Sequence, residues 1–381
     1  MNICFFITTL TKGGAERVIS NLANGFSENS TNKIEILTMY NTKIDYDLNK
    51  NIVINSLDEK YVDPYKLQNN SRGIKKLIKH ILKFLKYIQL KKNLRKYMKN
   101  KEFDVVVTFL PEPSFMILSQ KKYVKSKIII SDRNDPKEEY NTIRTNHLMK
   151  KLYPLADGFV FQTDDAKHYF DKIIKCESKI ILNPVNEKFI KEPYLGKREK
   201  NIINVGRLEK QKNQMLLIKA FEKIKDDICD TKLIIYGEGS LKSYMQDYIN
   251  ENNLKDRIFL MGQADNIEDK IYKSSLFVLS SSYEGMPNVL VEAMCLGLPV
   301  ISTDCDCGGP RMLIKNEENG ILVSNNNGEE LGNAMKMVMK NEKLAAKLSQ
   351  NAHSISKIVN KKVILNDWDS FIKKIVKRKK M

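Results

Sequence analysis

The sequence predicts an α/β protein built from two doubly wound parallel sheets, and three observations lead to this prediction. The chain has 381 residues, and single hydrophobic cores stop growing at about 250–300 residues, so two domains are expected. Short apolar runs of the buried-strand type alternate with helical segments in both halves, as in parallel sheets covered by helices. A charged stretch at 186–200 contains Pro193 and Gly196, a composition typical of a linker between domains.

The predicted domains are 1–185 and 201–355, with a helix and a basic tail over 356–381. Strands of the first domain are predicted at 2–9, 33–40, 51–55, 104–109, 127–131, 158–161 and 179–182. Strands of the second are predicted at 201–206, 232–236, 257–262, 275–280, 298–303 and 319–323. These runs are apolar rather than alternating, which favours strands buried on both faces.

Composition narrows the class of protein. The apolar share of 42% and the charged share of 29% are those of an ordinary globular protein, and no run of 18 apolar residues occurs, so no membrane-spanning helix is expected. The first residues are apolar without a basic leader or cleavage site, and they are interpreted as a strand rather than a signal peptide. The six cysteines are scattered, so neither disulfides nor a metal site is predicted, and a reducing cytosol fits.

Charge points to an anionic partner. Lysine and arginine total 64 against 46 acidic residues, a net charge of +18, which indicates contact with nucleic acid, anionic lipid or a phosphate-bearing substrate. No nucleic-acid module with interleaved aromatic residues is evident, so lipid is favoured and nucleic acid is not expected as a partner.

One predicted helix, 72–99, concentrates this charge without any acidic residue. Its apolar positions follow helical spacing, at Ile74, Leu77, Ile78, Ile81, Leu85 and Ile88. A basic amphipathic helix can lie on an anionic membrane. The alternative is a domain helix with its stripe in the core and its lysines in water, and one helix can satisfy both. The residues predicted to face lipid phosphates are Lys75, Lys76, Lys79, Lys83 and Lys86.

The strongest candidate site is the stretch 280–297. A strand leads into a loop of small residues, and Pro287 can open a helix that Gly297 is placed to end. Free amides at a helix start attract phosphates, and Glu284 in the loop and Glu292 in the helix are suited to sugar hydroxyls. The pattern therefore favours a nucleotide sugar as ligand. Taken alone, such a pair favours the plainer alternative, a loop anchor and a solvated helix position.

The wider motif resolves this ambiguity. The loop contains Glu-Gly-Met-Pro-Asn, and Gly-Leu-Pro-Val-Ile-Ser-Thr follows the helix. This resembles the donor-sugar signature of retaining glycosyltransferases of the GT-B fold, family four, in which two glutamates are separated by seven residues. The resemblance covers nearly the whole chain and implies two Rossmann-like domains facing across a cleft, with a C-terminal helix that crosses back to the first domain.

The resemblance also implies roles for the second domain's residues. Glu284 eases positive charge at the anomeric carbon, and Glu292 holds the ribose. A Gly-Arg pair at a strand end with a lysine five residues on assigns Arg207 and Lys212 to the donor diphosphate; taken alone, these are surface cations of a lysine-rich protein. The nucleotide is expected to lie along Gly237 and beyond the strand that ends near Gly262 and Asn266. The amides expected to help the leaving diphosphate are those of Asn288, Val289 and Leu290.

In the first domain, the Gly-Gly-x-Glu-Arg turn at Gly13 and Gly14 is implied to face the donor. Asp132, Arg133 and Asn134 follow a predicted strand, and relatives with a Ser-x-Arg-Asn-x-Pro pattern use this segment for the acceptor. The alternative is a polar loop turned by Pro136. Many relatives have a histidine near this point and this chain has none, so its base is not assigned.

The sequence thus predicts a retaining, metal-independent hexosyltransferase without a cofactor. Its donor is a nucleotide diphosphate sugar, expected to be UDP-linked, and its acceptor a saccharide, expected to be lipid-linked, in the synthesis of a surface glycan such as a capsule or O-antigen. It is expected in the cytoplasm, peripheral at the inner face of the cell membrane. The alternatives are a non-catalytic scaffold of the same fold and a nucleotide-sugar epimerase.

Overall fold

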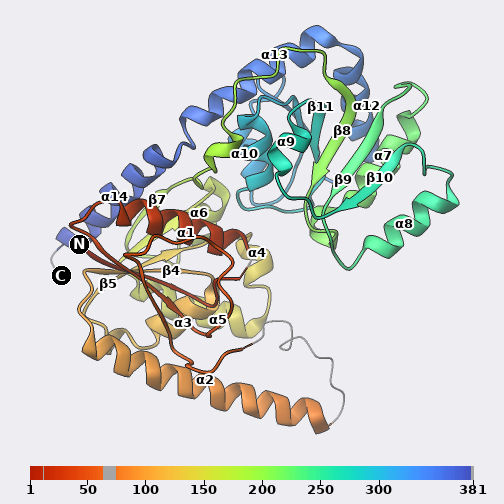
Figure 1. The fold of residues 1–381 in the computed structure, drawn as a ribbon. Helices are drawn as coiled ribbons and strands as arrows, with labels where there is room; N and C mark the ends of the chain where they lie inside the picture. The colour runs from red at the N-terminus through yellow and green to blue at the C-terminus, as the bar shows by residue number, and fades with distance from the viewer. Residues whose placement is uncertain (12, 63–73, 379–381) are drawn as a thin grey trace. The chain divides into compact units, whose positions relative to one another are not determined.

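The computed structural model describes residues 1–11, 13–62 and 74–378, and for residues 74–80 it describes the backbone alone (Figure 1). The chain divides into two units. The first comprises Met1–Ile181 together with Ile364–Met381, and the second is Leu182–Val363. The stretch 186–200, predicted as a linker, falls within the second unit, where Phe189 is buried in a core cluster.

The first unit is a parallel sheet with helices on both faces. Its strands lie in the order β3-β2-β1-β4-β5-β6-β7. Because β1 pairs with both β2 and β4, the strand order reverses at β1. The strands are β1 (Asn2–Ile7), β2 (Lys33–Thr38), β3 (Val53–Ser56), β4 (Val105–Phe109), β5 (Lys127–Ser131), β6 (Gly158–Phe161) and β7 (Glu177–Ile180).

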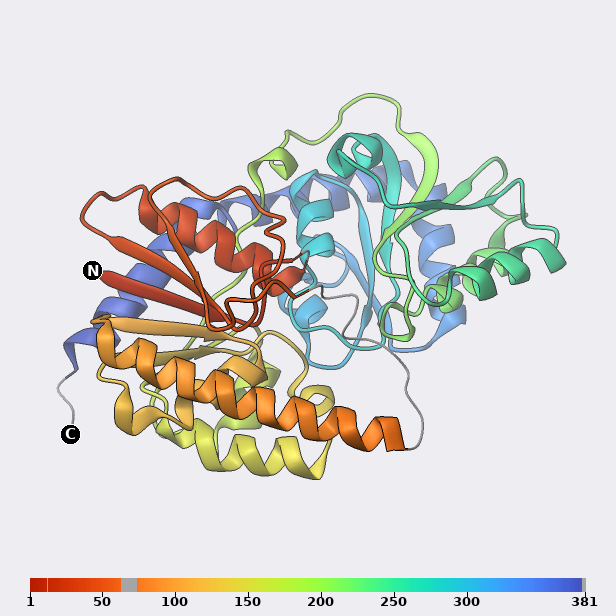
Figure 2. The same cartoon turned by 60° about the horizontal axis from the view of Figure 1, so that its bottom comes forward.

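Helices α1 (Gly14–Ser27) and α14 (Lys361–Lys377) pack closely at Gly25. A Cβ atom at Gly25 would lie only 2.3 Å from the Leu365 side chain, so any larger residue would have to displace Leu365. Figure 2 shows α1 on one side of this sheet and α2 (Ile74–Asn100) on the other. The remaining helices of the unit are α3 (Pro111–Leu118), α4 (Pro136–Glu139), α5 (Ile143–Leu152) and α6 (Asp164–Phe170). The C-terminal helix therefore belongs to the first unit, as the GT-B resemblance implied.

The second unit repeats the architecture, with strand order β10-β9-β8-β11-β12-β13. Neighbouring residues of β8 enter opposite cores: Ile202 packs with α7, α8 and α12, and Ile203 packs with α10 and the segment around Ala352. The strands are β8 (Glu199–Val205), β9 (Lys232–Tyr236), β10 (Ile258–Gly262), β11 (Ser274–Leu279), β12 (Val300–Asp304) and β13 (Ile321–Ser324). The helices are α7 (Gln214–Ile224), α8 (Lys242–Glu251), α9 (Ile267–Ile271), α10 (Asn288–Cys295), α11 (Gly309–Leu313), α12 (Gly328–Lys340) and α13 (Glu342–His353).

Helix α2 departs from the alternative interpretation in which its whole apolar stripe packs in the core. Leu90, Leu94 and Met98 are buried, but Ile81 and Leu85 are 52% and 54% exposed. The reason is length: α2 has 27 residues, about 40 Å at 1.5 Å per residue, whereas strands of five or six residues span about 17–20 Å. Its first turns therefore extend past the strands that cover its second half (Figure 2).

No helix in the described part of the chain is long and apolar enough to cross a membrane.

Candidate functional site

The candidate site lies at the carboxyl end of the second unit's sheet. Strand β8 pairs with β9 on one side and with β11 on the other, so the strand order reverses between β8 and β11. In open parallel sheets, loops at such a reversal diverge and leave a crevice for a ligand. Arg207 follows β8 and Glu284 follows β11, so the two residues predicted from separate motifs arrive at the same switch point.

An ion pair occupies this point. The Lys212 Nζ atom lies 2.5 Å from Glu284 Oε1, and the exposed fractions of the two side chains are 15% and 8%. The Ser281 hydroxyl donates to the same Oε1 at 2.7 Å. Both contacts go to the Oε1 atom of the carboxylate. The Oε2 atom is therefore the oxygen that can accept a hydrogen bond from a ligand. At this degree of burial, a lysine and a glutamate attract more strongly than on an open surface.

The loop that carries Glu284 is fastened to its surroundings by main-chain hydrogen bonds. The Ser282 amide donates to the Gln211 carbonyl at 2.8 Å, and the Gln211 side chain donates to the Tyr283 carbonyl at 3.1 Å. The Glu284 amide donates to the Asp306 carbonyl at 3.1 Å. These hydrogen bonds hold the loop in place and with it the position of the Glu284 carboxylate. A site that is held in this way needs little rearrangement when a ligand binds.

Helix α10 begins just after this loop. Pro287 is its N-cap and Asn288 its first residue, one position later than predicted for the proline. Leu290, which was predicted to offer its amide to the diphosphate, donates that amide to the Pro287 carbonyl at 3.0 Å. Of the predicted amides, those of Asn288 and Val289 remain at the open start of the helix. Gly297, with φ of +65°, follows the helix end as expected.

Two predicted side chains of α10 are held by protein. The Asn288 side-chain oxygen accepts from the Asn183 side chain at 2.7 Å, so this side chain fixes the helix start. Glu292 is buried, with 7% exposure. It lies four residues after Asn288, about one turn along the same face.

Arg207 is the exposed cation of the site. Its Nη2 atom lies 3.4 Å from the Gln211 side-chain oxygen, and its carbonyl accepts from Gln214 at 3.0 Å. The backbone is therefore fixed while the guanidinium reaches outward. An exposed arginine with a single long hydrogen bond is free to reorient toward a phosphate, for which its planar fork is well matched.

Two glycines lie at the ends of the strands beside the switch point. Gly237, after β9, has φ of +146°, and a Cβ there would lie 1.9 Å from the Gly206 carbonyl oxygen. Gly262 ends β10 and accepts from the Gly237 amide at 2.8 Å. Asn266 is exposed and is the N-cap of α9, with φ of +51°. The loops after β8, β9 and β10 share the carboxyl edge of the parallel sheet.

Gly13 and Gly14 lie at the corresponding edge of the first unit, where Gly13 precedes α1 and Gly14 begins it. The Tyr46 hydroxyl accepts from the Gly13 amide at 2.8 Å and donates to the Gly13 carbonyl at 2.7 Å. The Gly13 main chain is therefore held by this tyrosine, for which no motif in the sequence provided a signal.

The predicted acceptor residues follow β5. Asp132 is buried, and its Oδ2 accepts from the Tyr140 hydroxyl at 2.7 Å; that hydroxyl lies 2.6 Å from the Tyr153 hydroxyl. Burial raises the pKa of Asp132 from 3.8 to about 7. A carboxyl group with a pKa near neutrality is suited to exchanging a proton.

Arg133 and Asn134, which were predicted to face the acceptor, have protein partners in the structure. The Arg133 guanidinium lies over the rings of Phe109 and Trp368, 4.6 and 5.8 Å from their centroids, and burial lowers its pKa. This contact is a cation–π interaction inside the unit rather than a surface charge. Asn134 is exposed and donates to Glu139 at 2.5 Å.

The predicted lipid-facing lysines divide. The side chains of Lys75, Lys76 and Lys79 lie outside the described part of the structure. Lys83 is exposed. Lys86 forms an ion pair with Asp58. The helix itself has no acidic residue, as the sequence shows, but the fold brings a carboxylate from another segment to this lysine.

The residues that support the site were not predicted from the sequence. Ser281 and Gln211 hold the Glu284 loop, and Tyr140 and Tyr153 surround Asp132. The run of three serines before Glu284 was a visible signal for the first. The tyrosines had no such signal, because they come from segments 8 and 21 residues beyond Asp132 that only folding brings together.

Comparison with known proteins gives one family match. Residues 185–354 match the model of the family described as Glycosyl transferases group 1. The matched segment falls inside the second unit and contains the switch point with its ion pair.

Two relatives from Campylobacter jejuni align along nearly the full chain. N-acetylgalactosamine-N,N'-diacetylbacillosaminyl-diphospho-undecaprenol 4-alpha-N-acetylgalactosaminyltransferase is 29% identical over 377 residues, which are 95% of this chain and 96% of that protein. GalNAc-alpha-(1->4)-GalNAc-alpha-(1->3)-diNAcBac-PP-undecaprenol alpha-1,4-N-acetyl-D-galactosaminyltransferase is 25% identical over 378 residues, 98% of this chain and 99% of its own.

Among solved structures, HepE of Anabaena in complex with UDP has a TM-score of 0.78. The match covers 98% of this chain and 100% of HepE at 16% identity, so it concerns the fold.

Proposed function

We propose that this chain, a GT-B glycosyltransferase whose second unit belongs to the glycosyl transferases group 1, moves a sugar from a nucleoside diphosphate to a lipid-linked saccharide. The α/β fold with two doubly wound sheets and the family were predicted from the sequence and are confirmed. The observation that carries the finer proposal is the Lys212–Glu284 ion pair beside the start of α10, at the strand reversal of the second unit.

The proposed donor is a nucleoside diphosphate hexose, with UDP as the nucleotide. Arg207 and Lys212 supply cations, and the Asn288 and Val289 amides supply hydrogen-bond donors for the diphosphate. Glu284 Oε1 is held by Lys212 and Ser281, so Oε2 receives a sugar hydroxyl. Glu292, one turn along α10, is placed to accept from a ribose hydroxyl. HepE of Anabaena, which shares the fold, was solved in complex with UDP, and this supports the choice of nucleotide.

The proposed chemistry is transfer with retained configuration. The bond between the anomeric carbon and the diphosphate oxygen breaks as the acceptor oxygen bonds to the same face of that carbon. The acceptor proton passes to the departing diphosphate oxygen. Negative charge grows on the diphosphate in this step, and preorganised donors at that position stabilise it more than they stabilise the substrate. The role of Arg207 and Lys212 is to balance this charge, which makes the reaction independent of a metal.

The proposed acceptor is a saccharide on a polyprenyl diphosphate. The names of both Campylobacter relatives specify a diphospho-undecaprenol or PP-undecaprenol acceptor, and the alignments extend over nearly the whole of this chain. The acceptor residues in this proposal are those after β5, with Asp132 beside the reacting hydroxyl because burial holds its pKa near neutrality. The product belongs to a cell-surface glycan.

The test is a donor panel followed by a transfer assay. A ligand at about 100 times its dissociation constant adds about 2.7 kcal/mol of stability, so one UDP-sugar should raise the melting temperature above the others. That donor, incubated with polyprenyl diphosphate-linked saccharides, should give an α-linked product from an α-linked donor, as read by NMR of the anomeric proton. An inverted product, an isomerised free nucleotide sugar, or no donor binding at all would each refute the proposal.

We also propose that the chain acts at the inner face of the cell membrane, bound through charge. The net charge of +18 and the exposed lysine Lys83 on α2 support attraction to anionic lipid. Such attraction is screened as salt rises, since the Debye length falls from about 10 Å at 0.1 M to 3 Å at 1 M. Flotation with anionic vesicles should therefore decrease with salt. Unchanged flotation and transfer after reversing the charges of Lys75, Lys76, Lys79 and Lys83 would reject this location.

A further inference from the structure

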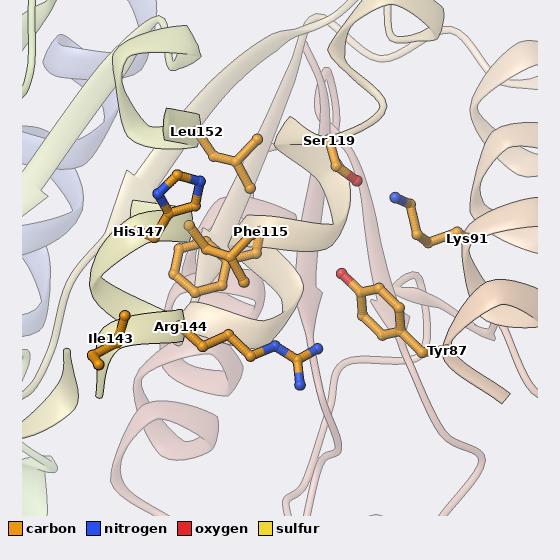
Figure 3. Close-up of a pocket in the computed structure, with 9 residues that line it drawn as sticks. Tyr87, Lys91, Phe115, Ser119, Ile143, Arg144, His147 and Leu152 are labelled. Atoms are coloured by element: carbon orange, nitrogen blue, oxygen red, sulfur yellow. The ribbon is translucent and has the colours of Figure 1, made fainter. Parts of the chain in front are cut away.

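The first unit contains a cavity whose lining residues are distinct from those assigned to sugar transfer. It lies among α2, α3 and α5 and has a volume of about 530 Å³ (Figure 3). Cavities of roughly 300–1,000 Å³ are those that hold small ligands in proteins. None of the residues that line it was singled out by the sequence motifs.

The floor of this cavity is apolar. Phe115 and Leu152 line it and are almost fully buried, and Leu148 and Ile143 complete the wall contributed by α5. Ile143 is 93% exposed, so the wall opens to solvent at that end. An apolar surface of this kind is covered favourably by a hydrocarbon chain, at about 25 cal/mol for each Å² removed from water.

The rim carries two cations, Lys91 and Arg144, and one histidine, His147. Lys91 comes from α2, and Arg144 and His147 come from α5. Figure 3 shows Tyr87 and Lys91 on one side and Arg144 and His147 on the other, with Phe115 between them. Among the described residues, neither Lys91 nor Arg144 forms an ion pair. Burial and the neighbouring Arg95 lower the pKa of Lys91, which is the response of a cation that lacks a compensating anion.

The nearby carboxylate Glu112 does not cancel this charge. It acts on Tyr87, whose pKa is raised by burial first and by Glu112 second, whereas Arg144 lowers it. Burial also raises the pKa of Glu112, and Lys83 opposes that shift. Among the described residues, Glu112 forms no ion pair with Lys91 or Arg144 either, so these two cations remain available to an anionic ligand.

The apolar floor continues along α2 beyond the cavity. Phe84, Tyr87 and Lys91 are spaced by three and four residues and so share one face of the helix. Phe84 is 59% exposed, and Ile81, Leu82 and Leu85 around it are also exposed. An exposed apolar surface of this kind marks an interaction site in a soluble protein.

We propose that this cavity binds one anionic phospholipid of the bilayer, with its phosphate between Lys91, Arg144 and His147 and its upper acyl chain on Phe115 and Leu152. A free phosphate would leave the floor uncovered, and a neutral apolar ligand would leave the cations unmatched. The exposed face from Ile81 to Leu85 then enters the membrane interface, as amphipathic helices do. The inference rests on the membrane location proposed above and adds a defined lipid site to it.

The experiment compares soluble probes on the full chain by calorimetry. The probes are a short-chain phosphatidylglycerol, the matching phosphatidylcholine, glycerol phosphate without acyl chains, and a short polyprenyl phosphate. We expect the phosphatidylglycerol to bind at one site, tighter than each of the others by at least about tenfold. Equal binding of the phosphatidylcholine or of glycerol phosphate would overturn the proposal, and tighter binding of the polyprenyl phosphate would assign the cavity to the acceptor instead.

Two variants and a matched control locate the site. Arg144→Glu reverses an exposed charge of the rim, and Ser119→Trp fills the cavity from the residue just after α3. Lys96→Glu makes the same change of charge at an exposed position of α2 outside the cavity. The first two should weaken phosphatidylglycerol binding by at least about tenfold and the control by less than about twofold. Equal losses for Arg144→Glu and Lys96→Glu would refute a defined site.

The lipid site, the transfer reaction and the membrane location can be tested independently of one another. Transfer to a soluble short-chain acceptor should be unchanged in Arg144→Glu, whose melting temperature reports folding. If all variants still float with anionic vesicles and lose nothing in probe binding, the lipid site is wrong and the membrane location stands. If the wild type does not float at low salt, the membrane location is wrong as well.

Discussion

The two units both carry charged side chains at the carboxyl edge of a parallel sheet, and the surroundings of these side chains differ. In the second unit, Lys212 and Glu284 follow β8 and β11 as a pair that remains 15% and 8% exposed. In the first unit, Asp132 is as buried as Glu284, at 6% exposure for each, but its printed partner is the Tyr140 hydroxyl, and Arg133 lies over the rings of Phe109 and Trp368. Strand order brings charges to the carboxyl edge in both cases, and the packing around that edge decides what they can do.

The difference has a physical consequence for the ligand. An ion pair at a strand reversal can exchange one partner for a phosphate while its charges stay compensated. A carboxyl group that burial brings to a pKa of about 7 is instead suited to a neutral hydroxyl and its proton. Under the proposed function, this difference suits the second unit to the ionic donor and the first unit to the neutral acceptor hydroxyl.

Removing the second unit's carboxylate should have the largest effect. In Glu284→Gln, Lys212 loses its charged partner and the sugar loses an acceptor, so kcat should fall by about 100- to 1,000-fold, the scale of one preorganised group. Steady-state transfer assays measure this, with Glu342→Gln, an exposed carboxylate at the start of α13, as the control. A kcat within about threefold of wild type would contradict the assignment.

The backbone of the second unit should be nearly as sensitive. In Gly237→Ala, the Cβ would lie 1.9 Å from the Gly206 carbonyl oxygen at a φ of +146°, so the free energy of unfolding should fall by about 2–4 kcal/mol. The partner glycine supplies the control, because a Cβ at Gly206 meets only Lys212 and Gln214 side-chain atoms at 3.5 Å or more. Urea melts of both variants test this, and equal losses would show that the loop is not held by this contact.

Much of this edge was predictable from sequence, for a physical reason. Arg207, Lys212, Glu284 and Gly297 lie within short segments that carry their own strand, turn and helix signals, so local pattern places them. The strands fell close to their predicted positions because buried parallel strands read as continuous apolar runs. The strand ends differ by up to two residues, as at β7, which is Glu177–Ile180 rather than 179–182.

The first unit contains features that the local sequence pattern does not predict. The stripe on α2 is continuous in sequence, yet Leu94 is buried and Leu85 is 54% exposed, because the helix outruns the sheet that covers it. The pairing of Lys86 with Asp58 and the tyrosines around Asp132 join distant segments. Helical periodicity gives the face of a helix, but the extent of the covering surface comes only from the tertiary structure.

The buried carboxyl group of the first unit should make stability depend on pH. Its folded pKa of about 7 lies above the unfolded value of 3.8, so the folded state binds the extra proton between these values and stability is lost as pH rises from about 4 to about 7. Asp132→Asn should remove this loss and gain a few kcal/mol above pH 7, at about 1.4 kcal/mol per pKa unit.

Urea melts from pH 4 to 8 measure this dependence, and Asp171→Asn, an exposed carboxylate of the same unit, is the control. If the wild type and Asp132→Asn keep the same slope throughout, the carboxyl group is ionised in the fold and the contrast with the second unit disappears. A matching shift in the pH dependence of kcat would tie the group to the acceptor hydroxyl as well.

The smallest effect on stability is expected on the exposed part of α2. Leu85→Gln changes a side chain that is 54% exposed, so the free energy of unfolding should move by no more than about 0.5 kcal/mol. Leu94→Ala on the same helix empties a fully buried position and should cost about 2–5 kcal/mol of the free energy of unfolding.

Binding to anionic vesicles should follow the opposite order, with Leu85→Gln weakening it because a polar group replaces apolar area at the membrane interface. Unfolding and vesicle flotation measured on the same two variants separate these properties: a large stability loss in Leu85→Gln would mean that this face packs against protein, and the contrast between the two halves of α2 would then be one of degree.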